Sequence, residues 1–264
     1  MFVDYHTHCD SSFDSIAPMA SMIQASIDMG MDHFCLTDHL DFDVRFSRLC
    51  GSLDPLAYNR LQAKEIARFP QADVRRGIEV GVQPHLMDTI RDRLAGCEFD
   101  FVIASLHYIG GQDPYFPDFY EGLCNIDVYT AYLQGLMDSL TGFDDYSVVG
   151  HIGYPSRFVP SGERYMKYDD LRDVSDELLR LVIQTGHGIE VNTSSYKTHG
   201  APVPGFDYVR RFCELGGEVV TVGSDAHRPE DMGRYFTEAV EGIREAGFRY
   251  LSAFKGGQPE FFRI

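Results

Sequence analysis

The sequence predicts an α/β fold, a barrel of seven β/α units in one domain that spans residues 1–264. Short apolar segments alternate with amphipathic helices, and successive strand ends lie roughly 30 to 45 residues apart. No Gly-x-Gly pattern follows the first strand, which favours a barrel over a doubly wound sheet that binds dinucleotides. Nearly every strand-like segment is followed by a histidine, an aspartate or a glutamate.

The strands are expected where short, β-branched or apolar runs end in ligand-type side chains. The first run, Phe2–Tyr5, alternates like a strand and leads directly into His6. The other expected barrel strands are Phe34–Thr37, Val74–Ile78, Phe101–Ser105, Val148–Gly150, Gly188–Ile189 and Val219–Gly223. A last segment, Tyr250–Phe254, reads as an incomplete strand.

The helices between these strands are indicated by apolar periodicity and by end signals. Asp54 and Pro55 form an N-cap and first-position pair, and Gly30, Gly186 and Gly247 follow three of the helices. The expected helices are Ala17–Met29, Pro55–Phe69, Pro84–Leu94, Asp127–Leu140, Asp169–Thr185, Pro204–Leu215 and Pro229–Ala246.

The composition limits the possible partners and the compartment. With 40 acidic against 23 basic residues, the formal charge of -17 disfavours binding to nucleic acid and to anionic lipid, and favours binding of divalent cations. The six cysteines form no Cys-x-x-Cys pair and are expected to be free thiols; they are Cys9, Cys35, Cys50, Cys97, Cys124 and Cys213. No leader or membrane-spanning segment is evident, so a cytoplasmic protein is expected. The sequence does not indicate the oligomeric state.

The residues that follow the strands indicate metal chemistry. His6 and His8 are spaced i, i+2, so both imidazoles are expected on one side of the chain. Six of the ten histidines lie at strand ends; they are His6, His8, His39, His107, His151 and His227, joined by Glu79 and Asp225. Because the carboxyl ends of barrel strands meet at one face, these side chains should converge there. Imidazole and carboxylate are ligands of Zn, Mn and Fe, which predicts a metal-dependent hydrolase.

The strand-end motifs resemble the signature blocks of the PHP (polymerase and histidinol phosphatase) superfamily, and in particular its monofunctional histidinol-phosphate phosphatases. The blocks, in family order, are His6-x-His8, Thr37-Asp38-His39, Gly77-Ile78-Glu79, Ser105-Leu106-His107, Gly150-His151 and Gly223-Ser224-Asp225-Ala226-His227, with Glu190-Val191-Asn192-Thr193-Ser194 between the last two. The resemblance covers nearly the whole chain. It implies a distorted (β/α)7 barrel, similar to a TIM barrel, that holds three divalent transition-metal ions (Zn, Mn or Fe).

The resemblance also implies a ligand set for each metal. The first metal would be held by His6, His8, Glu79 and Asp225, the second by Glu79, His107 and His151, and the third by Asp14, His39 and His227. Asp10 is an alternative to Asp14, because the segment around Asp14 fits the family only loosely. Cys9 is a further possible ligand. Asp38 is expected to orient a histidine, while Glu190 is either such a supporting residue or an ordinary strand-end residue.

A phosphate monoester needs positive charge beside its oxygens, and two residues could supply it. Arg157, six residues after His151, resembles a phosphate-binding arginine of the family and offers a bidentate fork. Lys197 stands where the family more often has arginine, with His199 as a reserve candidate. Two long connections, from His107 to Cys124 and from Ile152 to Tyr168, are expected to shape the pocket.

The predicted reaction is hydrolysis of a small phosphate monoester, with L-histidinol phosphate as the first choice. Two cations can activate a water and clamp an in-line phosphoryl transfer, and Asp225 or His227 would protonate the leaving alkoxide. The alternatives are another sugar or nucleotide phosphate, and a non-catalytic metal-binding protein. An amidohydrolase is disfavoured because the fourth strand ends without a lysine, and a polymerase-linked exonuclease because the chain is acidic and short.

Overall fold

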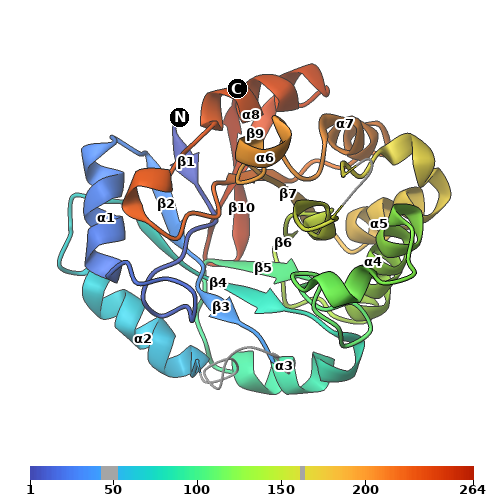
Figure 1. Ribbon diagram of the computed structural model, residues 1–264. Helices are drawn as coiled ribbons and strands as arrows, with labels where there is room; N and C mark the ends of the chain where they lie inside the picture. The colour runs from blue at the N-terminus through green and yellow to red at the C-terminus, as the bar shows by residue number, and fades with distance from the viewer. Residues whose placement is uncertain (43–52, 161–163) are drawn as a thin grey trace.

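The computed structural model describes residues 1–42, 53–160 and 164–264. Cys50 and part of the second long connection therefore lie outside the described residues. A mostly parallel sheet curls nearly into a closed barrel, with helices around it (Figure 1). Its strands are β1 Val3–Asp4, β2 His33–Leu36, β3 His39–Leu40, β4 Val74–Gly81, β5 Phe101–Ser105, β6 Val148–Val149, β7 Gly188–Asn192 and β8 Val220–Gly223.

These strands occupy seven positions in the order β1-β2-β4-β5-β6-β7-β8, which confirms the predicted barrel. The short β3 is not an eighth position, because β2 and β3 both pair with β4 in one continuous register. Phe34 lies opposite Val74, and His39 lies opposite Glu79. The strand is interrupted only at 37–38, and the interruption leaves His39 and Glu79 side by side at the carboxyl end.

The first and last strands close the barrel through backbone hydrogen bonds. The amide of Tyr5 donates to the carbonyl of Val222 over 3.0 Å, and the amide of Asp225 donates to the carbonyl of His6 over 2.8 Å. Two residues after His6, the amide of His8 donates to the carbonyl of Ala226 over 2.8 Å. Barrel closure therefore brings the first and the last ligand-type residues of the chain together.

Helices surround the sheet (Figure 1). Their bounds are α1 Met19–Asp28, α2 Pro55–Ile66, α3 Met87–Leu94, α4 Asn125–Leu140, α5 Arg172–Gln184, α6 Tyr196–His199, α7 Phe206–Glu214 and α8 Phe236–Glu245. The predicted cap of α2 is confirmed, because the Asp54 carboxylate accepts the amides of Leu56 and Ala57. Within the described residues, no helix is both long enough and apolar enough to cross a bilayer.

Two predictions for the C-terminal part were wrong. The helix expected from Pro229 starts only at Phe236, because 229–231 form a 3-10 turn and Tyr235, in the left-handed region at φ 56°, interrupts the helical backbone. The strand expected at Tyr250–Phe254 does not extend the barrel. It is β9 (Tyr250–Lys255), which pairs antiparallel with β10 (Gln258–Arg263) around a Gly256–Gly257 turn.

The β9–β10 hairpin covers the N-terminal end of the barrel. The amide of Phe254 donates to the hydroxyl of Tyr5 over 3.0 Å, and the amide of Val220 donates to Ser252 Oγ over 3.3 Å. Ala253 and Phe254 pack against the apolar side chains that fill this end of the interior; these are Val3, Tyr5, Cys35, Phe101, Ile103, Val148 and Val219. The polar side chains of the interior therefore gather at the opposite end.

Alternation along β4 separates the helix-facing core from the polar interior. Ile78 and Val80 belong to the core beneath the helices, so Glu79 points into the barrel. Gly81, the next inward position, has no room for a side chain: a Cβ there would lie 1.9 Å from Asp41 Oδ1. Gly223 on β8 is similarly restricted, because its Cβ would lie 2.3 Å from His6 Cβ. Glycine at these strand ends leaves space for buried polar groups.

We predict that Gly81→Ala lowers the free energy of unfolding by about 1–3 kcal/mol, the usual cost of overpacking a filled interior. Urea unfolding of the wild type and the variant measures this loss. In an Asp41→Ala background the same substitution should cost clearly less, because the clashing carboxylate is gone. An equal loss in both backgrounds would contradict the proposed origin of the strain.

Candidate active site

Glu79 is the centre of the polar end of the barrel, and its carboxylate is completely buried. Its two oxygens face different histidines. Oε2 lies 2.8 Å from His39 Nδ1 and 3.3 Å from His6 Nε2, whereas Oε1 lies 2.9 Å from His151 Nε2 and 3.4 Å from His107 Nε2. Each oxygen can therefore serve a different cation, as the sequence suggested for this residue.

Asp225 completes the group around His6 and His8. Its Oδ1 lies 3.3 Å from His8 Nε2 and 3.7 Å from His6 Nε2. The residue is held in the left-handed backbone region at φ 55°, which costs about 1–3 kcal/mol for a side chain other than glycine. Its amide hydrogen bond to the His6 carbonyl holds this conformation where the ends of β1 and β8 meet.

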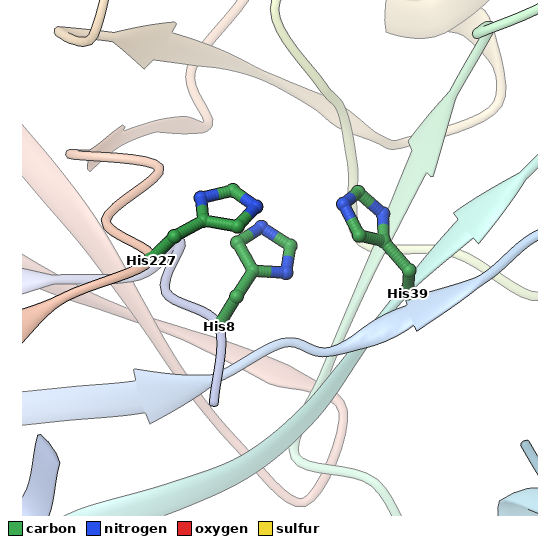
Figure 2. Close-up of side chains that lie close together, drawn as sticks. All are labelled: His8, His39 and His227. Carbon is green, nitrogen blue, oxygen red and sulfur yellow. The ribbon is translucent and has the colours of Figure 1, made fainter. Parts of the chain in front are cut away.

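His8, His39 and His227 form a second group, and Asp14 contacts two of these histidines. Figure 2 shows His8 and His227 side by side, with His39 opposite them on β3. The ring centroid of His8 lies 4.3 Å from that of His39 and 4.2 Å from that of His227. Asp14 Oδ2 lies 3.0 Å from His227 Nε2 and 3.5 Å from His39 Nε2. Its rival Asp10 instead accepts the amide of Met19 at the start of α1.

The donor atoms fit a set of bound metal ions. Among the described residues, several buried ligand atoms of this cluster lie close to one another without a hydrogen bond of good geometry; they include Nε2 of His6, Nε2 of His8, Nδ1 of His39 and Oε2 of Glu79. In the described part of the chain, four trios of ligand-type side chains bring their ligand atoms within 4.8 Å of one another; they are His6/His8/Glu79, His39/Glu79/His107, His6/His151/Asp225 and His8/His39/His227. Because leaving buried polar atoms unpaired is costly, this end of the barrel suits cations.

A surrounding layer of acceptors orients the imidazoles. His6 Nδ1 lies 2.6 Å from Glu190 Oε1, so the structure places Glu190 behind His6. His107 Nδ1 lies 2.9 Å from Asp41 Oδ1, a contact that sequence reasoning missed. Such contacts leave the opposite ring nitrogen free to face a metal, which is a common arrangement behind metal-binding histidines.

Asp38 acts on His8 through a hydroxyl group. His8 Nδ1 lies 3.1 Å from Ser12 Oγ, and Ser12 donates to Asp38 Oδ1 over 2.6 Å. The hydroxyl of Tyr58 donates to Asp38 Oδ2 over 2.6 Å, and the Cys9 thiol lies 3.0 Å from the same oxygen. Cys9 therefore faces Asp38 rather than the histidine cluster, and Asp38 has the supporting position that the sequence suggested.

Mutual attraction fixes the charges of the cluster. Burial alone would raise the pKa of Glu79, but His6, His39 and His107 lower it well below the usual range. Burial would likewise raise the pKa of Asp225, but His6 and Arg157 lower it well below the usual range. Burial would lower the pKa of His107, but Asp41 and Glu79 raise it to about 10. The metal-free cluster therefore combines ionised carboxylates with protonated imidazoles at His6, His39 and His107, whereas burial lowers the pKa of His8 and His151. A bound metal would displace the protons.

Arg157 ends the 3-10 turn Tyr154–Arg157 beside Asp225. Its Nη2 donates to Asp225 Oδ2 over 2.8 Å and to Asn192 Oδ1 over 3.0 Å. Its guanidinium lies 5.4 Å from the ring centroid of Tyr154. The predicted phosphate-binding residue thus lies at the edge of the cluster, and Asn192, which sequence reasoning did not select, holds it there.

Lys197 and His199 lie apart from the pocket that contains this cluster. Lys197 is about half exposed, and its Nζ donates to Asp231 Oδ1 over 3.0 Å. Lys197 lines a small separate cavity, and Asp225 is also part of the lining of that cavity. His199 lies on the short α6, and its Nε2 is buried without a hydrogen-bond partner among the described residues.

A pocket of about 420 Å³ opens above the histidines. Its volume is in the range of small-molecule sites. The floor and walls are formed by Phe13, Asp14, His39, Asp41, His107, Tyr108, Asp113, Tyr115, His151, Tyr154, Arg157, Phe158, Asp225 and His227. Both long connections contribute residues to it, which agrees with their expected role.

Family comparison supports this assignment over most of the chain. The family model described as PHP domain matches residues 4–194, and the model described as PHP-associated matches residues 209–251. The histidinol-phosphatase of Lactococcus lactis is 29% identical over 259 residues, which cover 96% of this chain and 94% of the relative. A probable histidinol-phosphatase of Thermotoga maritima is 24% identical over 250 residues, covering 95% and 94% of the two chains.

Solved structures show the same architecture. The crystal structure of histidinol phosphate phosphatase from Lactococcus lactis, in complex with Zn, L-histidinol and phosphate, superimposes with a TM-score of 0.87 at 27% identity. The match covers 98% of each chain. A putative histidinol phosphatase from Listeria monocytogenes gives a TM-score of 0.74 at 19% identity, over 89% of this chain and 99% of the other, and shares the fold.

The raised pKa of His107 predicts that the metal-free protein loses stability as the pH rises, whereas the metal-bound protein loses stability as the pH falls. Protonated His107 stabilises the folded state; this stabilisation is fully present below pH 6.5, the ordinary pKa of histidine, and is lost as the pH rises toward about 10. Chelator-treated protein should therefore lose several degrees of melting temperature over this range. With metal bound, stability should instead fall on acidification, because protons compete for the imidazoles.

The matched variants are His107→Gln and His85→Gln, the latter at an exposed histidine. In chelator-treated protein, His107→Gln should flatten the loss of melting temperature with pH, whereas His85→Gln should leave it as in the wild type. Equal slopes for all three proteins would contradict the assignment to His107.

Proposed function

The chain belongs to the PHP domain family, and we propose that it is a metal-dependent phosphatase that hydrolyses L-histidinol phosphate to L-histidinol and phosphate. The observation that carries this proposal is one pocket with a floor of histidines and carboxylates and with Arg157 at its edge. The overlap with a histidinol phosphate phosphatase across 98% of both chains supports the choice of substrate. The matched regions 4–194 and 209–251 share one sheet, so a single phosphoesterase domain is proposed.

Three divalent ions of Zn, Mn or Fe are proposed, and zinc is the metal in the Lactococcus lactis structure. The proposed ligands are His6, His8, Glu79 and Asp225 for the first ion, Glu79, His107 and His151 for the second, and Asp14, His39 and His227 for the third. The two oxygens of the Glu79 carboxylate lie near different histidines, which supports a bridging role. The contacts of Asp14 with two histidines favour Asp14 over Asp10.

When bound, divalent ions activate water and neutralise the charge of a transferring phosphoryl group. The side chains of the protein position the phosphate and protonate the leaving alkoxide. Arg157 binds the phosphate oxygens, for which its planar fork is suited. Both residues named for protonation of the leaving alkoxide, Asp225 and His227, line the pocket. His227 is the better proton donor: burial lowers its pKa, but Asp14 and Asp225 raise it above the usual value, whereas Asp225 stays ionised. Lys197 is proposed as a second phosphate contact, which requires it to leave Asp231.

The bridging role of Glu79 predicts an unequal effect of two conservative substitutions on metal content. Glu79→Gln should lower the occupancy of two sites, because an amide has one oxygen for a metal and no negative charge. Asp14→Asn should affect mainly one. Elemental analysis of gently purified protein measures both, and the wild type should hold more than one equivalent per chain. Equal metal content in the wild type and Glu79→Gln would count against the bridge.

Phosphate recognition predicts a loss of turnover without a loss of metal. Arg157→Ala should reduce kcat/KM for L-histidinol phosphate by about 10²-fold or more, the scale of one charged transition-state contact. Arg157→Lys should recover only part, because the fork is lost. Lys197→Ala should behave like Arg157→Ala if the lysine shares the phosphate. Unchanged kcat/KM in Arg157→Ala would move the phosphate contact to another residue.

The decisive experiment is a turnover screen of phosphate monoesters with metal-reconstituted protein. L-histidinol phosphate should have the highest kcat/KM. Preference for a sugar or nucleotide phosphate would replace the substrate and keep the reaction. Bound metal without turnover of any ester would indicate a non-catalytic metal-binding protein instead.

A further inference from the structure

Asn192 is a rigid point of the fold beside the histidine cluster. It is the last residue of β7, and it is completely buried. Its backbone is held on both sides. On one side it pairs with Gly223 of β8, and on the other it exchanges two backbone hydrogen bonds with Val203, over 2.9 and 3.0 Å. A side chain on such a backbone is a more precise support than one on a free loop.

The neighbours of Asn192 fix the orientation of its carboxamide. Oδ1 accepts the backbone amide of Ser194 over 3.1 Å and the hydroxyl of the same residue over 2.7 Å. Nδ2 donates to Glu190 Oε1 and to Asp225 Oδ2, each over 3.3 Å. An ionised carboxylate only accepts hydrogen bonds, so the carboxamide nitrogen must face the two acids and the oxygen must face the donors. The oxygen is thereby presented to Arg157.

Among the described residues, Arg157 has two hydrogen-bond acceptors, and they affect its charge differently. Its Nη2 donates to Asn192 Oδ1 over 3.0 Å and to Asp225 Oδ2 over 2.8 Å, while its Nε is buried without a partner in the described part of the chain. The carboxylate of Asp225 holds the guanidinium but also neutralises it. The carboxamide of Asn192 is neutral, so it holds the guanidinium and leaves the positive charge available to an anion.

We propose that Asn192 is a positioning residue for phosphate recognition, which holds Arg157 at the pocket edge with its charge available to the phosphate. This inference rests on the proposed function, because Arg157 is taken to bind the phosphate. Arg157 lines the pocket, whereas Asn192 is not part of the lining formed by the described residues, so Asn192 acts through the arginine. Without this support the long side chain must be ordered when phosphate binds, which costs affinity.

The test removes the carboxamide and measures phosphate binding in metal-reconstituted protein. Asn192→Ala should raise the Kd of inorganic phosphate, measured by calorimetry, about 10-fold or more, as expected for the loss of a hydrogen bond to a charged group. It should lower kcat/KM about 10- to 100-fold for L-histidinol phosphate and for p-nitrophenyl phosphate alike, because both esters share the phosphate. Elemental analysis should find the metal content of the wild type. Asn192→Ser, whose shorter hydroxyl side chain also loses the arginine, gives the same test if Asn192→Ala does not fold.

A double-mutant cycle separates positioning of the arginine from a general structural role. In an Arg157→Ala background, Asn192→Ala should change the Kd of phosphate and kcat/KM by less than about twofold, because the residue through which it acts is already absent. The matched control is Asn59→Ala on α2. Asn59 is also buried, and its carboxamide exchanges two hydrogen bonds with the backbone of Glu98, over 3.1 and 3.2 Å. This control should lower the melting temperature and leave the Kd of phosphate as in the wild type.

Three results would overturn the role of Asn192: an unchanged Kd of phosphate in Asn192→Ala, a loss of the same size in the Arg157→Ala background, or a loss of metal that accompanies the loss of phosphate. The proposed function stands in each case if the wild type hydrolyses L-histidinol phosphate. If the wild type hydrolyses p-nitrophenyl phosphate alone, the proposed substrate is wrong, and the Kd of phosphate still decides the role of Asn192. A metal-loaded wild type that neither binds phosphate nor hydrolyses either ester overturns both proposals.

Discussion

The buried carboxylate of Glu79 is the constraint on which the rest of the site depends. A carboxylate without access to water is strongly destabilising unless positive charge surrounds it. Here imidazole nitrogens approach both oxygens, and they come from four separate segments: the β1 end (His6, His8), β3 (His39), the β5 end (His107) and the β6 end (His151). Only a closed barrel with strand ends in register brings these segments to one carboxylate. Glu79 therefore links the fold to the chemistry.

The cluster keeps its geometry because a layer of acceptors surrounds the histidines. Glu190 behind His6 and Asp41 behind His107 fix which ring nitrogen faces inward. These additional carboxylates need space, and glycine supplies it: a Cβ on Gly81 would meet Asp41, and one on Gly223 would meet Glu190 Oε1 at 2.4 Å. The glycines at the strand ends thus belong to the site as much as the histidines and carboxylates, since they determine whether the supporting layer fits.

The sequence predicted the parts of this arrangement that follow from strand direction. Ligand-type residues after parallel strands must meet at one face, so the convergence of the strand-end histidines with Glu79 and Asp225 could be derived without coordinates. The supporting contacts could not. Asp41 and Asn192 have no spacing signal of their own, because their partners, His107 and Arg157, lie in segments that follow other strands and are distant in the sequence. The β9–β10 hairpin was missed for a related reason: an apolar run such as Tyr250–Phe254 does not reveal which edge it pairs with.

The acidity of the chain and its anionic substrate are reconciled by the same cluster. With a formal charge of -17, the protein repels a phosphate ester unless local positive charge outweighs it. Glu79, Asp225 and Asp14 have pKa values below their usual range, so they remain ionised and attract cations to the pocket floor. Arg157 alone does not reverse the charge, because its guanidinium is already paired with Asp225. Under the proposed assignment, a cation held by Asp225 would neutralise that carboxylate and leave Arg157 available for the phosphate, so phosphate affinity would depend on metal binding.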